Sequence, residues 1–107
     1  MATYMTQVTY TSEAWAAMVK HPQDRAEIVG KAMEKMGGRM LGFWWSFGEQ
    51  DAFVVFEMPD EVSAAAFMIA IAAGGACSNV KTTAVLSPAD AQKAVKKAKA
   101  SAYRPVK

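Results

Sequence analysis

The hydrophobic and polar positions at the start of the chain predict a β-strand followed by a helix. Threonine, tyrosine and valine, which favour strands, dominate Ala2–Tyr10. Ser12 and Glu13 then predict the start of a helix, because a serine caps the free amides of a first turn and an acid favours its positive end. The apolar stripe of this helix consists of Trp15, Met18 and Val19.

A proline interrupts the helical pattern that follows. Pro22 disfavours the helical conformation at His21, so we expect a break there and a second helix with Pro22 in its first turn. Apolar residues then recur at helical spacing until Gly37 and Gly38 end the run. These apolar residues are Ala26, Val29, Met33 and Met36.

Two strands without the usual alternation of apolar and polar residues are predicted next, over residues 39–47 and 52–58. In the first, strict alternation puts Leu41, Phe43, Trp45 and Phe47 on one face and Met40 and Trp44 on the other. In the second, apolar side chains again occupy both faces. An antiparallel sheet with one face in water normally alternates, so we expect both faces of this sheet to be covered.

The remaining elements complete a βαββαβ order. Pro59-Asp60 begins an alanine-rich helix that runs to about residue 73, and a strand is expected over residues 79–86. Ser87, Pro88 and Asp90 then predict the capped start of a further helix. The pattern predicts an α+β fold of ferredoxin-like type, with an antiparallel sheet, helices on one face and an extra C-terminal helix. The bare face of such a sheet is commonly covered by a second copy.

Several segments resemble a known family when they are taken in order. They are Ala2-Thr3-Tyr4, Pro22 with Arg25, Gly37-Gly38, Gly42-Phe43-Trp44-Trp45, Gly48-Glu49-Gln50-Asp51, Glu57–Asp60 and Asn79–Thr83. Over residues 2–90 the chain resembles the GYD-domain family, small bacterial and archaeal proteins. This resemblance implies a ferredoxin-like chain that pairs into a dimeric α/β barrel. The family motif has an aromatic residue, usually tyrosine, before the aspartate, and Gln50 stands there.

Charge divides the chain into two parts. Residues 1–92 hold six Lys or Arg and all ten acids, whereas residues 93–107 hold six Lys or Arg and no acid. We therefore predict a domain over residues 1–90 and a basic helix and tail over 91–107 that docks on the same or a neighbouring subunit. A solvated tail is the alternative, and nucleic acid is not the partner we expect.

The cysteine content and the hydropathy of the chain restrict its expected cellular location and the metal sites it could form. The chain has a single cysteine and no segment of the ~18 apolar residues that a membrane span needs. We expect a cytoplasmic protein without a membrane span. A structural zinc site needs about four Cys or His ligands. Because His21 and Cys77 are far apart, we expect neither a metal nor another cofactor.

The candidate catalytic residues are two carboxylates and an arginine. Asp51 ends the turn between the second and third strands, and Glu57 lies near the end of the third. Their ordinary roles are turn capping and ion pairing. A carboxylate at the mouth of an apolar cavity would instead have a raised pKa suited to acid–base chemistry. Arg25 would pair with one of them or hold a substrate carboxylate.

Aromatic residues give the candidate ligand pocket. Trp44 and Trp45 must point to opposite faces of one strand, one toward the helices and one toward a partner sheet. The complete set of predicted pocket residues is Phe43, Trp44, Trp45, Phe53 and Thr83.

These residues support a small homo-oligomeric protein that binds a small, largely apolar ligand. One alternative is a cofactor-independent enzyme, an isomerase, hydrolase or oxygenase, with a carboxylate in its pocket. The other is an accessory subunit that assembles with copies of itself or with another protein.

Overall fold

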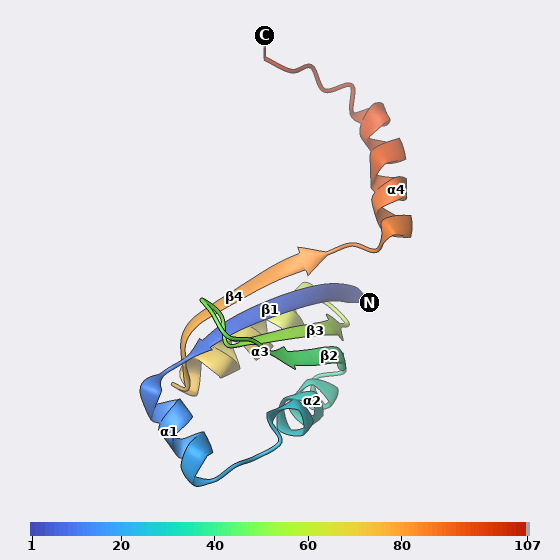
Figure 1. The fold of residues 1–107 in the computed structure, drawn as a ribbon. Coiled ribbons are helices and arrows are strands. Elements are labelled where there is room, and N and C mark those ends of the chain that lie inside the picture. The colour runs from blue at the N-terminus through green and yellow to red at the C-terminus, as the bar shows by residue number, and fades with distance from the viewer. Residues whose placement is uncertain (107) are drawn as a thin grey trace.

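Four antiparallel strands form one sheet in the order β2-β3-β1-β4. In the computed structural model, which describes residues 1–106, they are β1 (Ala2–Tyr10), β2 (Arg39–Trp45), β3 (Ala52–Met58) and β4 (Cys77–Val85). The helices are α1 (Ser12–Lys20), α2 (Arg25–Lys35), α3 (Glu61–Ala73) and α4 (Pro88–Ala98), and a short 3-10 turn follows at Lys99–Ser101. The predicted α+β, ferredoxin-like order is confirmed (Figure 1).

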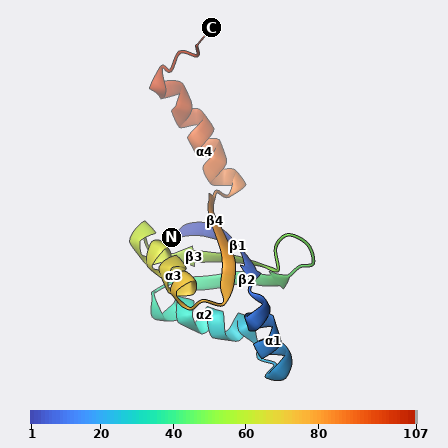
Figure 2. The ribbon, with the colours of Figure 1, turned by 90° about the vertical axis from the view of Figure 1, so that its left-hand side faces the viewer.

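Alternation along the two central strands places the core. Tyr4 and Val8 of β1 are buried, as are Val54 and Phe56 of β3. Their side chains point toward α2 and α3, which lie on the same side of the sheet (Figure 2). The fully buried Met33 is the α2 residue at the centre of this core. Within residues 1–106, no helix covers the other face of the sheet (Figures 1 and 2).

Both early helices begin at a different residue from the one predicted. Thr11, not Ser12, caps α1: its Oγ1 accepts a hydrogen bond from the Ala14 amide at 3.1 Å. The restarted helix begins at Arg25, with Asp24 as its cap, and Pro22 lies in the preceding connection. A side chain that can accept from a free amide decides each start more strongly than the proline does.

A β-bulge in β2 corrects the predicted faces of that strand. Met40 is paired with Phe56 and Gly42 with Val55, so Leu41 is an extra residue opposite no partner. The bulge returns Met40 to the helix-covered face, where it packs against the core. Strict alternation, which put Met40 with Trp44, was therefore wrong at this position.

Helix α4 stands away from the rest of the molecule. It begins as predicted, since the Ser87 Oγ accepts from the Asp90 amide at 3.1 Å. It then extends beyond the end of β4, away from the sheet and from α1, α2 and α3 (Figures 1 and 2). The molecule consequently measures 57 × 34 × 22 Å. Within residues 1–106, no helix combines the length and the apolar character needed to cross a membrane.

Candidate functional site

A cavity of about 360 Å³ lies between the sheet and the helices α2 and α3. Its walls come from alternate residues of the central strands and from the inner faces of both helices, which is why they are apolar. The main wall residues are Val8, Val54, Val29, Met33, Phe67 and Ile71. Cavities of this size and character are typical of small-molecule sites.

Three side chains bring polar chemistry to one part of the cavity lining: Tyr10, Arg25 and Cys77. Tyr10 ends β1, Arg25 begins α2 and Cys77 begins β4, so the fold gathers them from distant parts of the sequence. Neither Tyr10 nor Cys77 was predicted for the site. The alternation of β1 could have indicated Tyr10, but nothing in the sequence sets Cys77 apart from an ordinary packed cysteine.

Burial controls the protonation of the two acids in this cluster. It raises the pKa of the Tyr10 phenol, and the nearby Arg25 guanidinium opposes this shift. It also raises the pKa of the Cys77 thiol, again opposed by Arg25 and reinforced by Asp51. Both groups are therefore neutral at pH 7, and Arg25 carries the only positive charge on the cavity lining.

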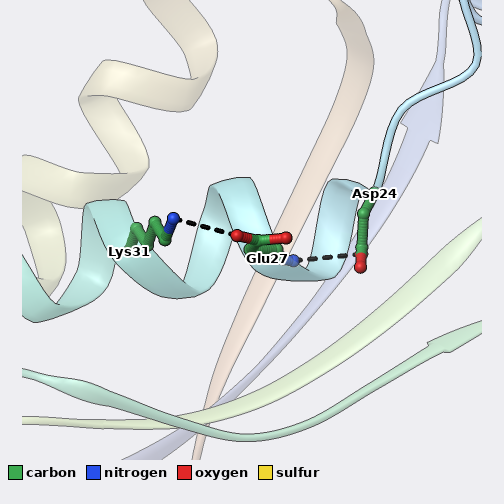
Figure 3. Close-up of polar contacts among 3 residues, drawn as sticks. All are labelled: Asp24, Glu27 and Lys31. Carbon is green, nitrogen blue, oxygen red and sulfur yellow. Dashed lines mark hydrogen bonds and ion pairs between the residues drawn. The ribbon is translucent and has the colours of Figure 1, made fainter.

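Arg25 is the first residue of α2, whose start is fixed by a cap and an ion pair. The Asp24 carboxylate accepts a hydrogen bond from the Glu27 amide at 3.1 Å, and the Glu27 carboxylate pairs with Lys31 at 2.9 Å (Figure 3). Arg25 itself donates from Nη1 to the Gln23 side-chain oxygen at 2.8 Å. Within residues 1–106 no ion pair involves Arg25, and its hydrogen-bond partner Gln23 is a neutral amide.

Asp51 lies beside this cluster but does not line the cavity. Its Oδ2 accepts from the Tyr10 amide at 2.8 Å and from the Trp15 indole at 3.4 Å. It thereby ties the start of β3 to the end of β1 and to α1. The adjoining Gln50, which stands in place of the family's aromatic residue, accepts from the Thr9 hydroxyl at 3.2 Å.

Glu57 lies on the opposite face of the sheet from the cavity. It is paired in register with Thr3 and Arg39, and its carboxylate accepts from the Arg39 Nε at 2.9 Å. The structure thus brings Arg25 near Asp51 but separates both from Glu57. The predicted catalytic trio does not form one cluster within this chain.

The predicted aromatic residues also divide between the two faces. Phe43 lines the cavity, and Trp45, on the same face, packs beside it with ring centroids 5.3 Å apart. Trp44, Phe53 and Thr83 lie on the face without helices. The prediction that the two tryptophans point to opposite faces is confirmed. Among residues 1–106, no group of three or more His, Cys, Asp or Glu side chains is arranged to hold a metal ion.

Comparison with protein families identifies the chain. A sequence model of the GYD domain matches residues 4–95. The protein belongs to the GYD-domain family. No curated protein matches it.

Two solved structures are similar to this GYD-domain protein. The crystal structure of FFRP-DM1 has a TM-score of 0.52 at 13% identity, covering 80% of this chain and 100% of that chain. This likeness supports the ferredoxin-like fold. A MhuD variant with two manganese protoporphyrin IX molecules bound per active site has a TM-score of 0.46 at 19% identity, covering 82% of this chain and 95% of that chain.

Proposed function

We propose that this protein binds a small, largely apolar molecule that carries one anionic group. The observation that carries the proposal is the apolar cavity of about 360 Å³ with Arg25 on its lining. The apolar walls provide burial for the body of the ligand. The guanidinium, which has no carboxylate partner within residues 1–106, provides a fixed positive charge for its anionic group.

The geometry favours binding over catalysis by a carboxylate. No Asp or Glu lies among the cavity-lining residues, and those residues all belong to the part of the chain that the structure describes. Asp51 is engaged by two donors outside the cavity, and Glu57 is paired with Arg39 on the other face. An enzyme that depends on a pocket carboxylate would need a group that this cavity does not present.

We further propose that the protein acts as a homo-oligomer built from sheet-to-sheet dimers that form an α/β barrel. Trp44 is 57% exposed on the helix-free face, beside Phe53 and Val55. Three large apolar side chains adjoining on a sheet face are costly to leave in water. A second copy of the same face would cover them symmetrically.

Native mass spectrometry of freshly purified protein is the first test, because it reports subunit number and any retained ligand together. Calorimetry with 2-naphthoate then tests the site, with the uncharged 2-naphthamide as its comparison. We expect the carboxylate to bind more tightly. We also expect Arg25→Gln to weaken naphthoate binding roughly 10- to 100-fold, because hydrogen bonds to charged groups contribute about 1.5–3 kcal/mol.

A pair of alanine positions on α3 provides the matched control. Ala70 lines the cavity and Ala72 does not, although both are exposed. We expect Ala70→Trp to block both probes and Ala72→Trp to leave both affinities unchanged. Equal binding of naphthoate by all three variants and the wild type would show that the cavity is not the site.

A further inference from the structure

The outer surface of α3 is apolar although it faces solvent. Val62 is 79% exposed and Ile69 is 68% exposed. With three exposed alanines they form one continuous helix face, here called the α3 outer face: Val62, Ala65, Ala66, Ile69 and Ala73. The core residues Ala64 and Phe67 lie on the opposite side of the helix. A helix face that stays in contact with water is normally polar, so this one is suited to a partner.

Helix α4 carries an apolar stripe of similar kind. The stripe consists of Ala91, Ala94, Val95 and Ala98, which share one helix face, and Val95 is 73% exposed. The rest of the circumference is mostly polar and includes Asp90, Gln92, Lys93, Lys96 and Lys97. Isolated helices shorter than about 12–15 residues are marginal in water, and α4 has 11 residues with no body beneath it (Figures 1 and 2). The helix therefore needs a surface on which to lie.

We propose that the α4 stripe of one chain packs on the α3 outer face of a second copy, with the two helices antiparallel. Alanines on both faces allow the close approach of helix axes, about 8 Å, that small side chains permit. The two helices also match in length, since α3 has 13 residues and α4 has 11. This contact is independent of the ligand cavity and of the sheet-to-sheet dimer.

The distribution of charge selects the antiparallel orientation. Helix α3 begins with Asp60 and Glu61 and has no basic residue in its last turn. Helix α4 has Asp90 in its first turn and Lys96 and Lys97 in its last. Antiparallel packing with Val95 opposite Val62 places Lys97, which flanks the stripe, beside Glu61 and sets the two helix dipoles in opposition. Parallel packing would separate these charges.

The connection to β4 explains why the partner is a second copy and not the same chain. Only Leu86 and Ser87 separate β4 from α4. In the sheet, Thr3 is paired with Val85 on one side and with Glu57 on the other. The end of β4 therefore lies level with the end of β3, and α4 starts at the same end of the sheet as α3. If α4 folded back on its own α3, the two helices would run parallel, with the lysines away from Asp60 and Glu61.

Disulfide trapping tests the contact. In a Cys77→Ala background, an untagged Val62→Cys chain is mixed with a tagged Val95→Cys chain and oxidised, because antiparallel packing places Val62 opposite Val95. We expect a disulfide that joins tagged to untagged chains, because two cysteines can bridge only when their Cα atoms lie within about 7 Å. Lys93→Cys, on the opposite side of α4, is the matched control and should give no such product.

The outcomes separate this contact from the other uses of α4. Equal yield with Lys93→Cys would mean random collision and would overturn the proposal, as would the absence of any mixed disulfide. A chain carrying both Ile69→Cys and Val95→Cys that closes on itself at high dilution would assign α4 to its own α3. Binding of duplex DNA or anionic vesicles by α4, without the mixed disulfide, would assign the helix to a polyanion.

A charge reversal provides a second, independent readout on the folded full chain. Glu61→Lys should lower the yield of the mixed disulfide, and Lys97→Glu in the partner should restore it. If Val62→Cys altered the far-UV circular dichroism, Ala65→Cys on the same face would replace it. Failure of Lys97→Glu to restore the yield would overturn the antiparallel arrangement.

Discussion

The indole ring of Trp44 lies over Gly42 on the helix-free face of the sheet, in the space that any side chain at residue 42 would need. Gly42 is paired with Val55 and Trp44 with Phe53, so the ring adjoins both of these apolar side chains. The glycine thus leaves room for a large aromatic ring against its own strand. An apolar surface of this kind suits contact with a second sheet.

Replacing each adjacent tryptophan with aspartate should separate assembly from stability. Trp44→Asp should abolish the sheet-to-sheet dimer in sedimentation velocity, because a carboxylate would be buried there without a partner. It should change the free energy of unfolding of the monomer by only about 0.5 kcal/mol, since the site is exposed.

Trp45→Asp is the matched comparison on the other face. Trp45 packs with the rings of Tyr10, Trp15 and Phe43 at centroid distances of 5.8, 5.6 and 5.3 Å. Its loss should lower the free energy of unfolding by roughly 2–3 kcal/mol, measured by urea denaturation. Sedimentation is measured in a Val95→Glu background, which disrupts the α4 stripe, because the α4 contact could otherwise hold two copies together. A Trp44→Asp protein that still sediments as a dimer in this background would contradict the proposed sheet interface.

The bounds of β1 and β3 could be read from the sequence because each is a run of strand-forming residues closed by polar or turn residues. The predicted ranges Ala2–Tyr10 and Ala52–Met58 are those observed. The faces of β2 could not be read in the same way. The bulge at Leu41 adds one residue without a change in the hydrophobic pattern, so Met40 appeared to belong with Trp44.

The candidate site was less accessible to sequence reasoning than the fold. Arg25 was predicted, but its neighbours Tyr10 and Cys77 come from segments that only the folded sheet brings together. Glu57 could not be distinguished from a pocket carboxylate until the register placed it beside Arg39. Local patterns specify strands and caps, whereas a cavity is specified by contacts between residues distant in sequence.

Asp51 should prove to be a structural residue. Asp51→Ala removes the acceptor for the Tyr10 amide and the Trp15 indole. We expect the free energy of unfolding to fall by about 1 kcal/mol, because the part-buried Tyr10 amide and the exposed Trp15 indole would lose a charged acceptor. Asp51→Asn retains an acceptor oxygen and should lose less. Urea denaturation of both variants measures the difference, and equal losses would show that the negative charge, not the acceptor, is what matters.

The cap of α2 should affect both stability and the orientation of Arg25. Asp24→Ala removes the acceptor for the Glu27 amide, so the free energy of unfolding should fall by about 1 kcal/mol. The frayed first turn should also weaken 2-naphthoate binding, as measured by calorimetry, while 2-naphthamide binding changes little. Asp24→Asn retains the cap and is the control. A loss of naphthoate affinity equal in both variants would point to charge rather than helix capping.

Stability should depend on pH in the alkaline range because of the buried Tyr10 phenol and the partly buried Cys77 thiol. Burial raises the pKa of Cys77 above its ordinary 9.0 and that of Tyr10 above its ordinary 10.0. The folded state therefore holds these protons more tightly than the unfolded state does. Below about pH 8 both groups are protonated in both states, so they should not make the free energy of unfolding depend on pH. As the pH rises through the pKa of the unfolded state and then that of the folded state, the free energy of unfolding should fall.

Two substitutions assign the parts of this pH dependence. Cys77→Ala should remove the decline that begins near the ordinary thiol pKa of 9.0. Tyr10→Phe should remove the decline that begins near 10.0, while it keeps the ring packed against Trp15 and Trp45. Urea denaturation at intervals between about pH 8 and pH 11 measures each curve against the wild type, so that the titration of lysines cancels. Because the same burial suppresses the thiolate, Cys77 should also react with a disulfide reagent more slowly than a free thiol at pH 8. Curves for Cys77→Ala and wild type that run parallel over the whole range would show that the thiol is not protected by the folded state.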